Sequence, residues 1–149
     1  MLEKAGQSPA NQLAAILLAA YLALLLILTF MPGTADTSRT VRVNVRPFAS
    51  IGPALRLGPG SFSYRQMAGN VAAFVPLGIL LPLARPRSSW PAVVLVGAGL
   101  SAVIESGQLA VSLALGYGYR AADVDDLILN ITGVVIGYVA VSTVRAITR

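Results

Sequence analysis

Four long apolar runs divide the 149-residue chain, with polar stretches between them. The runs cover about residues 13–30, 67–84, 91–115 and 124–144. A helix of about 20 apolar residues crosses the hydrocarbon core of a bilayer. The pattern therefore predicts an all-α integral membrane protein, a four-helix bundle with a Pro/Gly-rich loop between its first two helices. Residues 1–149 should form one transmembrane domain.

The polar stretch at residues 31–66 is the longest loop, and five arginines are interspersed among its Pro and Gly residues. Within it, residues 48–62 carry scattered apolar side chains, which suit an interfacial or re-entrant position. The preceding run, residues 13–30, is longer than the roughly 7–15 residues of a signal-peptide core, and a Met-Pro-Gly turn ends it. We therefore expect this run to be retained as a membrane anchor.

Composition narrows the available chemistry. The chain is 56% hydrophobic and 11% charged, and it contains no cysteine and no histidine. These two absences exclude disulfides, thiol catalysis, imidazole bases and the usual zinc sites. The sequence predicts no cofactor and no resident metal, so any chemistry must use carboxylates, arginine, amides or hydroxyls.

The net charge of +5 comes almost wholly from arginines in the loops that flank the apolar runs. This placement favours membrane head groups and argues against nucleic acid as a partner. Basic residues in short loops tend to face the cytoplasm. Lys4, Arg85, Arg87 and the arginines of the tail therefore predict a multi-pass protein of the cell membrane with both termini cytoplasmic, although the arginines of the first loop argue the opposite way.

Polar residues gather where the fourth run begins. Residues 120–133 include an arginine, an asparagine and three of the six acidic residues of the chain. A charge at the centre of a membrane helix costs roughly 2.5–3.5 kcal/mol, so charges persist there where they function or pair. Asp123, Asp126 and Asn130 share one helix face at positions i, i+3 and i+7. Asp125 points elsewhere.

Alternating crossings bring this cluster to the same membrane face as the first loop, the start of the second helix and the end of the third. Glu105 lies up to ~15 Å inside the third helix, at 1.5 Å of rise per residue. A carboxylate at that depth indicates function or an obligatory buried pair. The residues expected to line a polar, ligand-binding pocket are Arg46, Asn70, Glu105, Gln108, Arg120, Asp123, Asp126 and Asn130.

Several roles are open to these side chains. Glu105, Asp123 and Asp126 are the candidate catalytic residues, as acids, bases or groups that position a metal or nucleophile. Asp123 could equally cap the fourth helix, with Asp126 near the positive end of the helix dipole. Arg120 could pair with a carboxylate and simply close the bundle.

Four blocks of the sequence resemble the VanZ-like family of small bacterial membrane proteins. The blocks are Asn44 through Phe48, Asn70 through Gly78, Glu105 with Gln108, and Arg120 through Gly133 followed by Gly137. They stand in the family's order over roughly residues 40–140. The resemblance implies a compact four-helix membrane bundle, and the family's name implies a link to resistance against the glycopeptide antibiotic teicoplanin. It implies no biochemical activity.

Three functions fit these observations. The first is a non-enzymatic protein of the bacterial envelope whose pocket, at the outer membrane face, binds a lipid head group, a lipid-linked cell-wall precursor or a lipophilic glycopeptide. The second is a membrane-embedded enzyme that acts on a lipid-linked substrate by carboxylate acid–base or metal chemistry. The third is a structural or chaperone-like subunit, in which the polar stripe only orders the four helices. Gly133 and Gly137 also form a small-residue face that lets a helix approach closely, including one from a second copy of the chain.

Overall fold

The computed structural model describes residues 8–31, 40–118 and 122–148. Its four long helices are α1 (Pro9–Phe30), α3 (Phe62–Ala84), α4 (Trp90–Leu115) and α5 (Val124–Ile147). Each is long and apolar enough to cross a membrane. The prediction of an all-α membrane bundle is confirmed.

Two of these helices begin earlier than the apolar runs indicated, because serine caps start them in polar sequence. The Ser61 hydroxyl accepts a hydrogen bond from the Tyr64 N–H at 3.1 Å, so α3 starts at Phe62 instead of residue 67. The Ser8 hydroxyl likewise accepts from the Asn11 N–H at 3.3 Å at the start of α1. Hydropathy alone does not detect such polar first turns.

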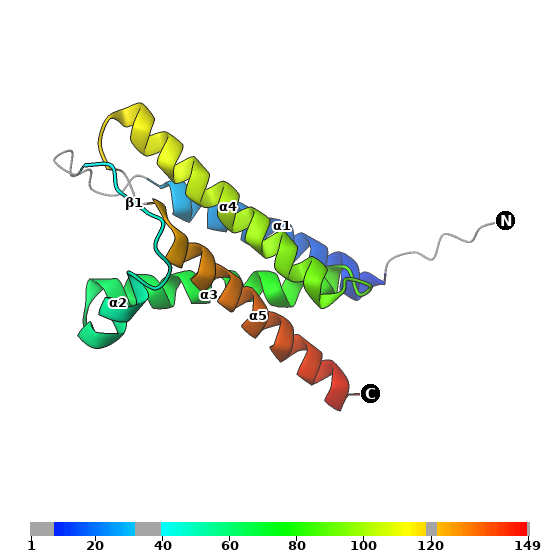
Figure 1. Cartoon of the computed structure of the whole chain (residues 1–149). Helices are drawn as coiled ribbons and strands as arrows, with labels where there is room; N and C mark the ends of the chain where they lie inside the picture. Colours follow the sequence, from blue (N-terminus) through cyan, green and yellow to red (C-terminus); the bar gives the residue numbers. More distant parts are fainter. Residues whose placement is uncertain (1–7, 32–39, 119–121, 149) are drawn as a thin grey trace.

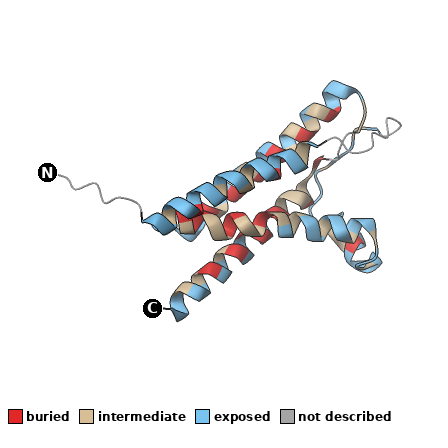
Figure 2. Cartoon of the chain, turned by 180° about the vertical axis from the view of Figure 1, so that it is seen from behind, coloured by how far each residue is buried: buried red, intermediate tan, exposed pale blue. Residues whose placement is uncertain are grey.

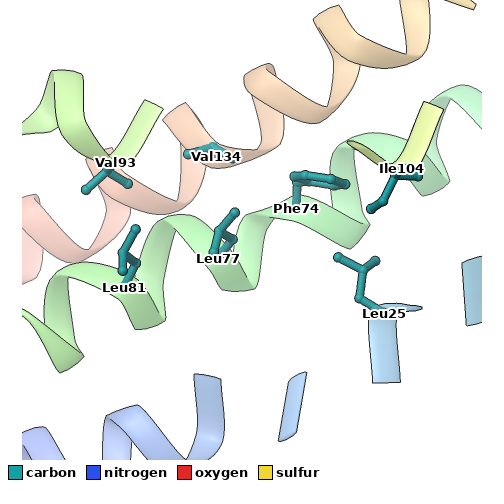
Figure 3. Close-up of a cluster of buried hydrophobic side chains, with 7 residues drawn as sticks. All are labelled: Leu25, Phe74, Leu77, Leu81, Val93, Ile104 and Val134. Carbon is teal, nitrogen blue, oxygen red and sulfur yellow. The ribbon is translucent and has the colours of Figure 1, made fainter. Parts of the chain in front are cut away.

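The helices pack around α3, which lies against both α1 and α5, while α4 covers α5 (Figure 1). Buried positions follow the lines where helices meet, and the outward faces are exposed (Figure 2). A cluster of buried aliphatic and aromatic side chains joins all four helices (Figure 3). Its members are Leu25 of α1, Phe74, Leu77 and Leu81 of α3, Val93 and Ile104 of α4, and Val134 of α5.

Glycines let the backbones of α3 and α5 touch. A Cβ at Gly133 would collide with the carbonyl oxygen of Val71, and a Cβ at Gly137 with that of Val75. From the other helix, a Cβ at Gly78 would meet the backbone of α5 in the same way. The glycine face of α5 expected to receive a neighbouring helix is therefore filled by α3 of the same chain.

The loop between α1 and α3 contains regular structure that hydropathy did not predict. Strand β1 (Val43–Asn44) pairs in parallel with β2 (Ala122–Asp123), which directly precedes α5. A short helix, α2 (Ile51–Leu57), follows and lies beside the first turns of α3 (Figure 1). We call this end of the bundle, where α3 and α5 begin and α4 ends, the loop end. The start of α1, the end of α5 and the turn between α3 and α4 lie at the opposite end (Figure 1).

Candidate functional site

Asp125 is the most enclosed carboxylate of the described chain, although its position off the polar stripe had set it aside. Its side chain is fully buried, at 0% exposure. Its two oxygens accept backbone hydrogen bonds from Phe48 at 2.5 Å, from Ser50 at 2.7 Å and from Ile51 at 3.2 Å. Successive backbone N–H groups that converge on one anion form a strong, charge-assisted site. Asp125 therefore fastens the first loop to the start of α5.

Asp123 is the N-cap of α5 and a second attachment point for the loop. Its Oδ1 accepts from the Asp125 N–H at 2.9 Å and from the Asn44 amide at 2.7 Å. Its Oδ2 accepts from the Ser50 hydroxyl at 2.5 Å. Both oxygens are thus engaged by the protein, as expected for a capping and positioning residue.

Glu105 is half-buried, not enclosed as its depth in the helix had indicated. Its Oε2 accepts a hydrogen bond from the backbone N–H of Asp123 at 3.3 Å. The side chain therefore reaches from α4 to the strand before α5, at the same corner as the Asp123 cap. This contact satisfies one backbone donor of β2 and gives Glu105 a structural role.

Asp126, one residue beyond Asp125, faces α3 and is half-buried. The side chains of Asn70 and Gln66 lie beside its carboxylate. The Nδ2 of Asn70 is nevertheless buried without a hydrogen bond of good geometry to any described residue. An amide and a carboxylate from two helices thus meet at the loop end, and one donor there is unsatisfied.

Asn130 lies one turn deeper in α5 and is 4% exposed. Its Nδ2 donates to the Ser101 hydroxyl of α4 at 2.8 Å, while its Oδ1 has no partner in the described part of the chain. Gln108 and Ser112, further along the same face of α4, are buried as well. A line of buried polar side chains therefore runs between α4 and α5 towards the loop end.

Two arginines, Arg46 and Arg120, were predicted to line the pocket, and the structure describes the first of them. The Arg46 side chain is exposed, and only its backbone belongs to the cluster, through an N–H bond to the Asn44 Oδ1 at 3.0 Å. Arg120 lies outside the described residues, so its place relative to the carboxylates stays a prediction. The structure thus brings Glu105, Asp123 and Asp126 to one corner of the bundle and leaves the Arg46 side chain on the surface.

Two other features of the bundle bear on what the acidic side chains at the loop end can do. Within residues 8–31, 40–118 and 122–148, no group of three or more acidic side chains is arranged to hold a metal ion. A hollow between α1 and α3 lies away from these acidic side chains, towards the end of the bundle where α1 begins and α5 ends. Its lining residues are Ala15, Leu18, Ala19, Leu22, Ala84 and Arg85.

Comparison with known families gives one match. Residues 18–145 match the family described as VanZ/LLP1, which spans nearly the whole chain. No curated protein and no solved structure matches the chain with significant similarity.

Proposed function

The chain belongs to the VanZ/LLP1 family of membrane proteins, and on that premise we propose that it is a non-enzymatic protein of the bacterial cell envelope. Its loop end binds the polar head group of an anionic lipid or of a lipid-linked cell-wall precursor. The observation that carries this proposal concerns two buried amide atoms near Asp126, Asn70 Nδ2 of α3 and Asn130 Oδ1 of α5, which make no hydrogen bond of good geometry to any described residue.

Unsatisfied amides are costly inside a membrane protein. Each buried polar group without a partner costs several kcal/mol in hydrocarbon, because no water is present to replace the missing bond. One of the two atoms is a donor and the other an acceptor. A head group with hydroxyl, amide or phosphate oxygen atoms supplies both kinds of partner, and an alkyl chain supplies neither.

Charge near the cluster supports an anionic ligand. Arg42 and Arg46 are exposed on the loop that Asp123 and Asp125 hold at this end of the bundle. Guanidinium groups bind phosphate through paired, charge-assisted hydrogen bonds. The proposed ligand therefore has its phosphate at the arginines and its hydrogen-bonding part nearer the amides.

An enzymatic role receives less support from these contacts. The Asp123 carboxylate binds a backbone N–H and two side chains, and Glu105 binds a further backbone N–H. Such contacts suit positioning better than proton transfer, which needs a carboxylate that can reach a substrate. The sequence motifs had made both residues candidates for catalysis.

Ligand-dependent thermal stability of the purified protein in nanodiscs tests the proposal. Phosphatidylglycerol, a polyprenyl pyrophosphate and teicoplanin serve as separate probes, with phosphatidylcholine as the neutral reference. A ligand present at 100 times its Kd stabilises the folded state by about 2.7 kcal/mol. We expect one or more of the anionic lipids to raise the Tm, and a selective response to teicoplanin would assign the site to the glycopeptide instead.

The variant Asn70→Leu separates binding from folding. It replaces an amide whose Nδ2 makes no hydrogen bond of good geometry with an apolar group of similar size, so the ligand-free Tm should stay close to that of the parent while the ligand-induced shift disappears. Thr132→Val is the matched control, because Thr132 is exposed and its hydroxyl bonds the carbonyl of Ile128 in its own helix. An Asn70→Leu protein that loses stability and keeps the full ligand shift contradicts the proposal.

A further inference from the structure

Residues 40–62 form a surface, here called the loop platform, on which large apolar side chains and arginines are both exposed. Figure 2 shows most of this segment in the exposed colour. The exposed apolar side chains are Val43, Val45, Phe48, Leu55, Leu57 and Phe62. Each has more than half of its surface accessible, with Val45 at 76% and Phe62 at 73%. Apolar exposure of this extent on one short segment marks an interaction surface.

The loop platform is fixed to the bundle along its length. Strand β1 pairs with β2, and its Asn44 amide bonds the Asp123 carboxylate. Three backbone N–H groups, those of Phe48, Ser50 and Ile51, bind the buried Asp125 carboxylate, and Ala54 of α2 is 2% exposed. The exposed side chains are therefore held in place by a rigid backbone.

The backbone of Phe48 is held in an unfavourable conformation that keeps its side chain exposed. Its φ of +65° lies in the left-handed region, which is unfavourable for a bulky residue. The Phe48 N–H donates to Asp125, and this bond holds the strained backbone. The ring is 65% exposed, so the strained residue turns an aromatic side chain outward instead of into the core.

The charge of the segment identifies its partner. Residues 40–62 contain Arg42, Arg46 and Arg56 and no acidic residue. The segment joins directly to α3, whose first turns lie beside α2 (Figure 1). Apolar side chains next to arginines at the end of a membrane helix match the boundary between acyl chains and anionic head groups. A second copy of the same surface would bring like charges together.

From these observations we infer that the loop platform docks onto the anionic phospholipid surface of the leaflet in which α3 begins. Its apolar side chains enter the leaflet, and its arginines contact the phosphates. The inference goes beyond the proposed function, because it concerns the outer surface of the loop and is tested at Leu55 and Arg56, which the proposed ligand site does not use.

Single-cysteine labelling in proteoliposomes tests the docking, because the chain has no cysteine of its own. Leu55→Cys places a polarity-sensitive fluorophore on α2, and brominated lipids quench it on contact. We expect quenching by brominated lipid in vesicles of phosphatidylcholine with phosphatidylglycerol, and weaker quenching in phosphatidylcholine alone. Ser89→Cys, in the exposed turn between α3 and α4, provides the control outside the loop platform.

Arginine substitution then tests the charge requirement. An arginine near an anionic surface contributes about fivefold to binding. Arg56→Gln in the Leu55→Cys protein should therefore reduce the response to phosphatidylglycerol by about fivefold on this scale. The Arg56 side chain is exposed and has no part in the proposed ligand site, so the Tm of this variant should equal that of its parent.

Two results overturn the inference. In the first, aqueous iodide quenches the label fully and brominated lipid does not, which places α2 in water. In the second, the label changes only when the protein-to-lipid ratio rises, which identifies a second copy as the occupant. Neither result alters the ligand-induced Tm shift of the buried amides, so failure of the docking and failure of the proposed function are distinguishable.

Discussion

Replacing the buried Asp125 with asparagine should release the first loop from the bundle. The carboxylate accepts three backbone N–H groups, two on Oδ2 and one on Oδ1. The best orientation of an asparagine keeps its oxygen towards Ser50 and Ile51 and turns its NH₂ against the Phe48 N–H. This change removes one charge-assisted hydrogen bond, weakens two others and leaves one donor facing another. Together these effects should lower the free energy of loop attachment by about 3 kcal/mol.

Limited proteolysis measures this release directly. Trypsin can cut after Arg42 and Arg56 but not after Arg46, because Pro47 follows it. When opening is fast relative to cleavage, the cleavage rate follows the population of the open loop. A cost of about 3 kcal/mol predicts cleavage that is ~100-fold faster, at tenfold for each 1.4 kcal/mol.

Asp126→Asn is the matched control for this experiment. It removes the same charge one residue later, where the carboxylate lies beside Asn70 and Gln66 of α3. Its cleavage rate should stay within about twofold of the parent, corresponding to roughly 0.5 kcal/mol. If Asp126→Asn releases the loop and Asp125→Asn does not, the reasoning about backbone attachment is refuted.

Other predictions concern the packing of the helices. Gly133→Ala should lower the free energy of unfolding by ~1–3 kcal/mol, because the new methyl group collides with the backbone of α3. Gly99→Ala, with open space around its Cα, should raise it by ~0.5–1 kcal/mol, and equal Tm values for the two variants would contradict the close crossing. Tyr21→Phe removes a 2.6 Å hydrogen bond to the Ala73 carbonyl and should cost ~0.6–1 kcal/mol in denaturant titration; an unchanged midpoint would mean that the bond contributes nothing.

The four helices were predictable from the sequence because the apolar character that favours a membrane helix is a local property of each segment. Twenty apolar residues specify a membrane helix whatever lies around them. The spacing of Gly133 and Gly137 also predicted a close helix approach, which α3 makes. The identity of that helix was not predictable, since small residues permit an approach without selecting the partner.

The attachment of the first loop could not be predicted, because the groups that bind it carry no signal in the sequence. Helical spacing grouped Asp123 with Asp126 and set Asp125 apart, whereas the structure has Asp123 and Asp125 both bound to Ser50 of the first loop. It could not reveal that Asp125 binds Phe48 and Ser50, because these partners are 77 and 75 positions away and contribute only backbone N–H groups. Every residue carries such a group, so no sequence pattern marks the ones that will bind a carboxylate.

The parallel pairing of β1 with β2 also governs the order in which the protein can be assembled. The Asn44 and Asp123 side chains that meet there are separated by 79 positions, with α3 and α4 between them. During synthesis, residues 40–62 are made early, yet their binding partners are made only when the last helix begins. A chain interrupted before residue 122 therefore leaves the arginine-rich segment unattached. Completion of this corner therefore has to wait until the first residues of the final helix have been made.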